Sequence, residues 1–257
     1  KTTGHGTQTF EEAVKNSCNP ALMQVAAKIG GSSFYKYFEL FGYTSKTGVD
    51  LPGEASGLYT TPSNFNAVEL ACYSFGQTFK TTMIQQISAI AAVANGGYLV
   101  TPRTVSALID SNGNVVKSYD KEIKRTVISP SVGEEIMKVL EDGVSGNGGA
   151  KNAYVAGYRL AAKTGTSEKI DKKNETGKEY YVCSCVGFAP ADDPEIAVII
   201  LVDEPTKGLL YGSSVAAPYI ARLFETILPY MGVEAVYTAE ELENLAVTVP
   251  NMKERNM

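Results

Sequence analysis

The feature that most constrains the fold is a succession of three predicted strands in the second half of the chain. They cover about residues 157–167, 180–188 and 195–203, and the third contains the longest aliphatic run, Ala197 to Val202. The stretch "APADDPE" between the second and third runs predicts a hairpin turn. Because strands joined by a tight turn run antiparallel, we expect an antiparallel sheet at the centre of the fold.

Helical patterns precede and follow these strands. The last predicted helix covers about 213–231, directly after the third strand. Other helices are expected over residues 7–17, 19–30, 32–42, 81–97 and 129–144. A hairpin with Asn112-Gly113 at its turn is expected over 104–119, and the glycine- and proline-punctuated residues 43–80 predict irregular structure. Helices, then strands, then a helix indicate an α+β fold with helices flanking the sheet.

The ends and faces of the first helices can be predicted in more detail. Thr9 is the expected N-cap of the first helix, with Glu12 completing a capping box. Asn19 is the expected N-cap of the second, with Pro20 at the first helical position. The third carries an aromatic stripe that we expect to face the core: Phe34, Tyr37, Phe38 and Phe41.

The charge of the chain excludes a nucleic-acid-binding role. The net charge is −5 and the pI is about 5.1. The densest basic stretch, Lys169 to Lys178, also contains Asp171 and Glu175 and predicts a solvated loop. The longest aliphatic run is far shorter than the ~20 residues that a bilayer requires, so we expect no membrane segment in this chain.

Metal and histidine chemistry are not indicated. Cys183 and Cys185 are separated by one residue, whereas zinc ligands are usually separated by about two to four. The single histidine, His5, lies between glycines at a predicted turn, where bonds to nearby backbone are the expectation. We therefore expect no metal and no cofactor, with any proton transfer carried by lysine and hydroxyl groups.

The stretch "RLAAKTGTSEK" (159–169) has the character of a substrate site at a strand edge. Gly165 has no side chain, so an extended peptide can approach the backbone and add to the sheet as a strand. Lys163 supplies a positive charge for a carboxylate, while Thr164, Thr166 and Ser167 supply hydroxyl donors. Alternation along a strand places residues 163, 165 and 167 on one face and 164 and 166 on the other.

A second polar pair, Ser17 and Asn19 in "KNSCNPAL", lies in the break between the first two helices. Helix capping and loop filling explain this pair when it is considered alone. Together with the lysine stretch, however, it resembles the Ser-x-Asn and Lys-Thr-Gly motifs of penicillin-binding transpeptidases and serine β-lactamases. Longer stretches are similar to class B penicillin-binding proteins, the monofunctional peptidoglycan D,D-transpeptidases: "GVDLPGE", "SFGQTFKTTMIQQISAIAAVANGGYLVTPRTV", "VGFAPADDPEIAVIILVDEP" and "YGSSVAAPYIARLF".

This resemblance implies a β-lactamase/transpeptidase-like fold and an acyl transfer from D-Ala-D-Ala stem peptides. It gives Ser17 the role of proton relay to the leaving group, and Asn19 that of holding the substrate amide and a catalytic lysine. Lys163 would keep the site positive, support Ser17 and recognise the terminal carboxylate, which Thr164 and Thr166 would also bind. The Thr166 N–H would form half of the oxyanion hole. β-Lactam antibiotics would bind as substrate mimics.

The sequence departs from the family at the nucleophile. The family's Ser-x-x-Lys motif should precede Ser-x-Asn by tens of residues, and only 16 residues precede Ser17. The strings Ser33-Phe34-Tyr35-Lys36 and Ser118-Tyr119-Asp120-Lys121 match the motif, but at the wrong place and in the wrong context. We therefore expect no nucleophile in this chain, an incomplete N-terminal part of the domain, and no acylation of the chain by itself.

The resemblance also divides and locates the chain. Residues 1–235 are expected to belong to the transpeptidase domain, and 236–257 to a linker and the start of a PASTA-like cell-wall module, on the resemblance of "LAVTVPNMKERNM". The implied location is the extracytoplasmic face of the membrane in a Gram-positive-type cell wall, with the parent protein anchored upstream. Cell-division or elongation proteins are the implied partners, besides stem peptide and β-lactams.

Two alternatives remain open from the sequence. A serine β-lactamase or penicillin-sensor domain shares the motifs, and a well-placed glutamate that activates a deacylating water would favour the lactamase. A non-catalytic cell-wall-binding domain would lack the nucleophile by nature, and a Ser-x-x-Lys motif encoded upstream would exclude it.

Overall fold

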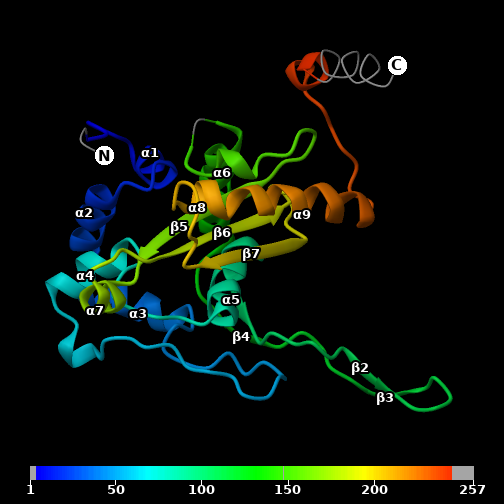
Figure 1. Ribbon diagram of the computed structural model, residues 1–257. Helices are drawn as coiled ribbons and strands as arrows, with labels where there is room; N and C mark the ends of the chain where they lie inside the picture. The colour runs from blue at the N-terminus through cyan, green and yellow to red at the C-terminus, as the bar shows by residue number, and fades with distance from the viewer. Residues whose placement is uncertain (1–3, 147, 245–257) are drawn as a thin grey trace.

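The computed structural model describes residues 4–146 and 148–244 and has an antiparallel sheet at its centre (Figure 1). Its strands are β5 (Ala161–Glu168), β6 (Tyr181–Ala189) and β7 (Ile196–Asp203), in the order β5–β6–β7. The predicted sheet and its direction are thus confirmed. The first strand begins at Ala161 rather than near residue 157, because Gly157 adopts a positive φ of 79° and belongs to a turn.

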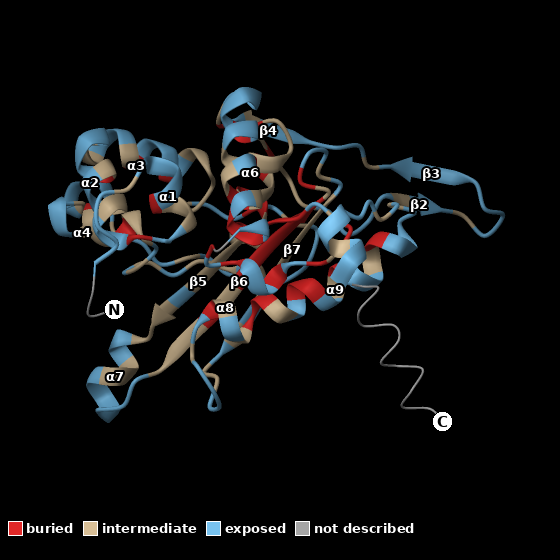
Figure 2. Ribbon diagram, turned by 90° about the horizontal axis from the view of Figure 1, so that it is seen from above, coloured by how far each residue is buried: buried red, intermediate tan, exposed pale blue. Residues whose placement is uncertain are grey.

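Helices cover both faces of this sheet, as Figure 2 shows from above. On one face lie α8 (Gly212–Val215) and α9 (Ala217–Tyr230), and on the other lie α5 (Met83–Ala94) and α6 (Pro130–Ser145). The α9 layer buries Ile220, Phe224 and Leu228 completely. The opposite layer packs Met137 and Leu140 of α6 against Val186 and Phe188 of β6. Burial of apolar area at about 25 cal/mol per Å² makes these two layers the main source of stability.

A group of helices at one end of the sheet forms the other body of the fold (Figures 1 and 2). It contains α1 (Phe10–Lys15), α2 (Asn19–Ile29), α3 (Gly31–Leu40), the short 3-10 helix η1 (Pro62–Asn64) and α4 (Ala67–Ser74). The Thr9 capping box is present as predicted. The expectation that Asn19 caps α2 is wrong: Cys18 occupies the cap position, and Asn19 is already helical.

One further prediction for this region is wrong, and another is wrong at a single residue. Helix α4 lies within residues 43–80, where we expected irregular structure, and its start carries a capping box of Asn66 and Glu69. The predicted aromatic stripe is buried at Phe38 and partly buried at Phe34 and Phe41. It fails at Tyr37, which is 47% exposed, and the buried neighbour is Tyr35 instead. Tyr35 is needed inside because it packs edge-on against Phe65 and donates to the Thr60 carbonyl at 2.9 Å.

The remaining elements lie at the periphery. Strands β2 (Ala107–Ile109) and β3 (Val115–Ser118) form the predicted hairpin, which projects away from the sheet (Figure 1). A pair that we did not predict, β1 (Tyr98–Val100) and β4 (Ile123–Thr126), joins this arm to the body. The 3-10 helix η2 (Lys151–Ala153) precedes β5.

The basic stretch after β5 forms a helix, α7 (Ile170–Thr176), rather than the loop that we expected, but it is solvated as predicted, since none of its residues is buried. Ion pairs hold it: Lys169 and Lys172 bond to Glu204, and Lys173 bonds to Glu168. Among the described residues, no helix is long and apolar enough to cross a membrane. The PASTA-like stretch 245–257 lies outside the described residues.

Candidate active site

Ser17 is held in the turn that ends α1. Its N–H donates to the Val14 carbonyl at 3.0 Å, and the Cys18 N–H donates to the Ala13 carbonyl at 2.9 Å. This is the Schellman pattern, which places the residue after the helix cap in the left-handed region. Ser17 takes that position with a φ of 51°, where glycine is the usual residue. The turn leaves the serine side chain exposed beside the sheet.

Lys163 of β5 meets this serine across the boundary between the helical group and the sheet. Its Nζ donates to Ser17 Oγ at 2.7 Å and to the Thr164 carbonyl at 2.9 Å, although 146 positions separate the lysine from the serine. Burial lowers the pKa of Lys163. Burial in turn raises the pKa of Cys185 to about 12, so this thiol stays neutral. A lysine with a lowered pKa, bonded to a hydroxyl, is suited to passing a proton through that hydroxyl.

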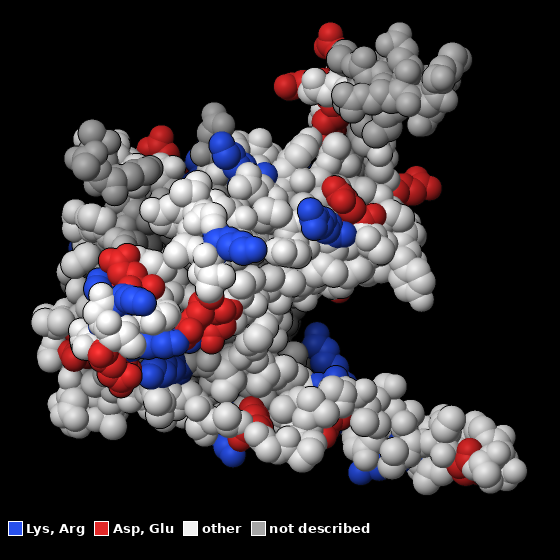
Figure 3. Space-filling model, viewed as in Figure 1, with Lys and Arg blue, Asp and Glu red and all other residues white. Residues whose placement is uncertain are grey.

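The charge of Lys163 is available to an anion. In the part of the chain that the structure describes, no carboxylate forms a salt bridge with it. Acidic and basic side chains instead gather with one another around α7, on the left of Figure 3.

The two threonines of β5 differ in their partners. The Gly212 N–H donates to Thr166 Oγ1 at 2.9 Å, and Thr166 is exposed. Thr164 Oγ1 donates to the Gly149 carbonyl at 3.5 Å, a distance at which a hydrogen bond is weak. Gly165 lies between them, and a Cβ there would be 2.7 Å from Ser184 Oγ on β6.

The far end of β5 contacts the segment before α5. Ser167 Oγ donates to Gln77 Oε1 at 3.4 Å, and Lys80 Nζ lies 3.2 Å from an Asp171 carboxylate oxygen at the start of α7. Gln77 and Gly212 are contacts of the predicted site that our sequence analysis did not single out. Both lie in stretches that carried the family resemblance, "SFGQ" and "YGSSVAAPYIARLF", which is the signal that was present.

Other candidates are not brought to this place by hydrogen bonds. Asn19 is exposed, and its side chain makes no hydrogen bond within residues 4–146 and 148–244. Ser118 ends β3 on the projecting arm, remote from β5 in Figure 1, and Ser33 is an exposed residue of α3. The structure therefore joins Ser17 to Lys163 and leaves both Ser-x-x-Lys strings apart from them.

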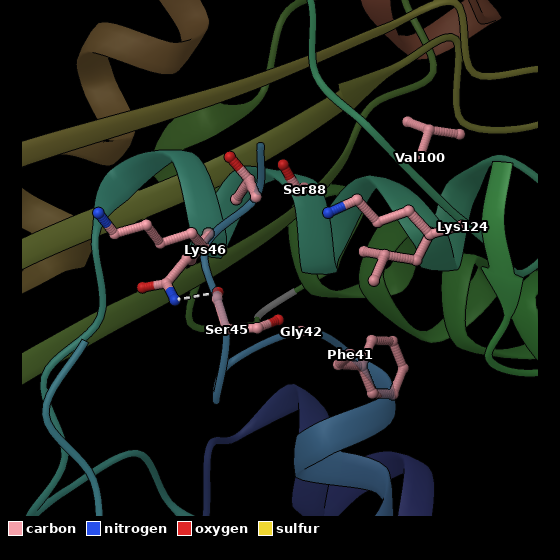
Figure 4. Close-up of a pocket in the computed structure, with 10 residues that line it drawn as sticks. Phe41, Gly42, Ser45, Lys46, Ser88, Val100 and Lys124 are labelled. Atoms are coloured by element: carbon pink, nitrogen blue, oxygen red, sulfur yellow. Dashed lines mark hydrogen bonds between the residues drawn. The ribbon is translucent and has the colours of Figure 1, made fainter. Parts of the chain in front are cut away.

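A separate small cavity lies between α3, α5 and the β1–β4 pair (Figure 4). Its volume is about 10 Å³, and Lys46, Ser88 and Lys124 are among its lining residues. A space of this size holds one water molecule at most, so it is not a substrate site.

An antiparallel sheet between helical layers, with a serine and a lysine bonded at its edge, defines a β-lactamase/transpeptidase-like α+β protein. The sequence matches the family model of the penicillin binding protein transpeptidase domain over residues 1–225. The chain belongs to this family, and the resemblance inferred from the motifs is confirmed.

Two curated relatives illustrate the match. Stage V sporulation protein D of Bacillus subtilis (strain 168) is 39% identical over 232 residues, which are 90% of this chain and 36% of the relative. Peptidoglycan D,D-transpeptidase FtsI of Escherichia coli (strain K12) is 26% identical over 226 residues, 88% of this chain and 36% of the relative. The chain thus spans about a third of the length of these relatives.

Solved structures agree in fold. Penicillin binding protein 3 from Mycobacterium tuberculosis, complexed with aztreonam, superimposes with a TM-score of 0.77 at 25% identity, over 90% of this chain and 54% of that one. The TP domain of penicillin-binding protein 3 from Burkholderia pseudomallei gives a TM-score of 0.77 at 27% identity, over 91% and 67%. The expected α+β fold class is confirmed.

Proposed function

We propose that this chain is part of a peptidoglycan D,D-transpeptidase and carries the proton-relay and carboxylate-binding half of its active site. The observation that carries the proposal is the 2.7 Å bond between Lys163 Nζ and Ser17 Oγ at the β5 edge. The substrate is a stem peptide that ends in D-Ala-D-Ala, and β-lactams bind in its place. No cofactor takes part.

The geometry suits one sequence of events. A peptide lies along β5 beside Gly165, with its terminal carboxylate close to the Lys163 charge and the Thr166 hydroxyl. A serine nucleophile gives its hydroxyl proton to the lysine of its own Ser-x-x-Lys motif as it attacks the D-Ala-D-Ala carbonyl, while the Thr166 N–H stabilises the oxyanion. As the C–N bond breaks, Ser17 gives its proton to the leaving amine and regains one from Lys163. When the acceptor amine takes the acyl group from the serine, the proton that this amine releases returns through Ser17 to Lys163. Asn19 holds the substrate amide, and Thr164 and Ser167 complete the polar lining.

We place the nucleophile outside these 257 residues, so the chain by itself does not acylate. Ser33 and Ser118 lack a hydrogen bond to Ser17 or Lys163 among the described residues, which supports this placement. The whole protein is proposed to act at the extracytoplasmic face of a Gram-positive-type cell wall, alongside cell-division or elongation proteins. The 39% identity to a Bacillus protein supports that setting.

The test of this proposal is an intact mass spectrum of the chain after incubation with a penicillin. We expect an unmodified chain, because the covalent step needs the absent serine. An adduct on the chain would overturn our placement of the nucleophile and direct attention to Ser33 and Ser118.

Non-covalent recognition is tested on the same material by NMR titration with an N-acetylated D-Ala-D-Ala peptide. We expect the Thr166 amide signal to shift and Lys163→Gln to abolish the shift. Lys169→Gln is the matched control, since Lys169 is paired with Asp203 and Glu204 away from the site. No shift in the unsubstituted chain would count against carboxylate binding by this half of the site.

A further inference from the structure

Gly212 makes an unusually close contact with the strand that carries the candidate site. It is buried at the start of α8, and a Cβ at this position would lie 2.3 Å from the Gly165 carbonyl oxygen and 2.4 Å from that of Ser184. Both oxygens belong to the backbone of β5 and β6, where residues 165 and 184 are register partners. They cannot retreat without distorting the pairing, so this position requires a residue with no side chain.

This close approach brings the Gly212 N–H within 2.9 Å of Thr166 Oγ1. A threonine hydroxyl has one proton to donate and two positions at which to accept. Because an N–H already points at the oxygen from the α8 side, the hydroxyl proton must be directed away from α8. Within the described ranges this proton has no acceptor, and Thr166 is exposed, so a bound ligand can supply one.

Thr164 shows the opposite arrangement. Its hydroxyl donates to the Gly149 carbonyl, and no backbone N–H donates to it among the residues that the structure describes. Its proton is therefore directed at the protein, although the distance of 3.5 Å makes this a weak bond. Of the two β5 threonines, Thr166 is the one whose donor is free and oriented before a ligand arrives.

We propose that Gly212 is a positioning residue, which fixes the Thr166 hydroxyl as a donor aimed at the terminal carboxylate of the substrate. This inference rests on the proposed function, since it assigns the carboxylate to the β5 edge. Its consequence is specificity. Both oxygens of a carboxylate accept hydrogen bonds. A C-terminal amide has one oxygen and one NH₂ group, and the NH₂ group cannot accept from the Thr166 hydroxyl or from Lys163.

The readout is the ratio of affinities for two probes, N-acetylated D-Ala-D-Ala with a free carboxylate and the same peptide as its C-terminal amide. Both are titrated by NMR into the 257-residue chain, into Gly212→Ala, into Thr166→Val and into the double variant. We expect Gly212→Ala to reduce the carboxylate preference about tenfold, the size of a weakened hydrogen bond to a charged group. In the Thr166→Val background, Gly212→Ala should leave the ratio unchanged, because the hydroxyl is already missing. Ser214→Ala, an exposed position on the same short helix, is the matched control and should keep the original ratio.

Each other outcome has a definite meaning. An unchanged ratio in Gly212→Ala, or equal weakening of both probes, overturns the positioning role and leaves a purely structural one. A further loss of the ratio in the double variant overturns it as well. Failure of the unsubstituted chain to prefer the carboxylate contradicts the proposed function instead. If Gly212→Ala does not fold, a backbone ester that replaces the residue 212 N–H with oxygen removes the donor without added bulk. The same tenfold loss is then expected, and an unchanged ratio rejects the proposal.

Discussion

At the level of single residues, Ser17 adopts an unfavourable backbone conformation but places its hydroxyl beside Lys163. A non-glycine residue in the left-handed region costs roughly 1–2 kcal/mol, and the Schellman turn after α1 would be satisfied more cheaply by glycine. Glycine, however, would remove the hydroxyl that accepts from Lys163. Strain retained at a residue that bonds the site lysine points to function rather than to folding.

This reasoning predicts that Ser17→Gly is more stable than Ser17→Ala. Both variants lose the bond to Lys163, so their difference isolates the backbone term, which we expect to be about 1 kcal/mol in the free energy of unfolding. Urea unfolding followed by circular dichroism measures it. Both variants should lose binding of the D-Ala-D-Ala probe to a similar extent. Equal unfolding midpoints would show that the turn is not strained at this residue.

At the level of helices and strands, the sequence predicts most of the elements but few of the tertiary contacts between them. The central strands, the β2–β3 hairpin, α5, α6 and α9 follow from apolar periodicity and turn residues. Helix α4 was missed because glycine and proline around it obscured the capping box at Asn66 and Glu69. Helix α7 was missed because it has no apolar periodicity, and its ion pairs include residues distant in sequence, such as Lys172 with Glu204.

The candidate site shows the same division. Ser17 and Lys163 were both identified from the sequence, but their bond spans 146 positions and only the resemblance implied that they meet. Gly212 carries no chemistry in its side chain, so no pattern of reactive residues could reveal it. Its role depends on how closely α8 approaches β5, which is a property of tertiary packing.

A further tertiary contact is made by the segment after α9, which folds back onto the turn before β5. The Val236 N–H donates to the Gly157 carbonyl at 2.7 Å, and the Gly157 N–H donates to Glu241 Oε1 at 3.0 Å. Tyr154 donates its hydroxyl to the same carboxylate. Burial favours the neutral acid, but the bonds from Tyr154, Thr238 and Gly157 outweigh it and lower the pKa of Glu241 to about 2.

We therefore predict that the contact between residues 236–241 and the turn at Gly157 opens in acid. A carboxyl whose folded pKa is lowered stabilises the contact fully above its ordinary pKa of 4.5, and loses that stabilisation as the pH falls toward about 2. Hydrogen-exchange protection of the Val236 amide should fall across this window. Glu241→Gln should show low protection already at neutral pH and little further change in acid. The exposed neighbour Glu240 provides the control, since Glu240→Gln should behave like the unsubstituted chain. Protection that is independent of both pH and Glu241 would contradict the prediction.

At the scale of the whole molecule, the described part of the sheet has two unpaired edges with different character. The β5 edge carries Lys163 and lies beside α1, so a charge and a neighbouring helix hinder its pairing with a strand of another copy. The β7 edge runs from Ile196 to Asp203 with apolar residues in between. Next to it is a hollow of about 430 Å³, lined by Ile200, Val202, Tyr219, Arg222 and Leu223. An apolar strand with free backbone groups is a template for pairing with another chain.

We predict that the isolated chain associates through β7 in a concentration-dependent way. Leu201 is 40% exposed on this strand, so Leu201→Lys places a charge at the edge at little cost to the core and should shift the chain toward monomer. Leu209→Lys makes the same chemical change at a 68% exposed position in the loop after β7, and should leave association unchanged. Sedimentation velocity over a wide concentration range distinguishes the variants. Because the β5 edge lies across the sheet from β7, the Leu201 variant should still bind the D-Ala-D-Ala probe. If the unsubstituted chain stays monomeric at every concentration, or if Leu201→Lys and Leu209→Lys associate equally, the chain does not associate through the β7 edge.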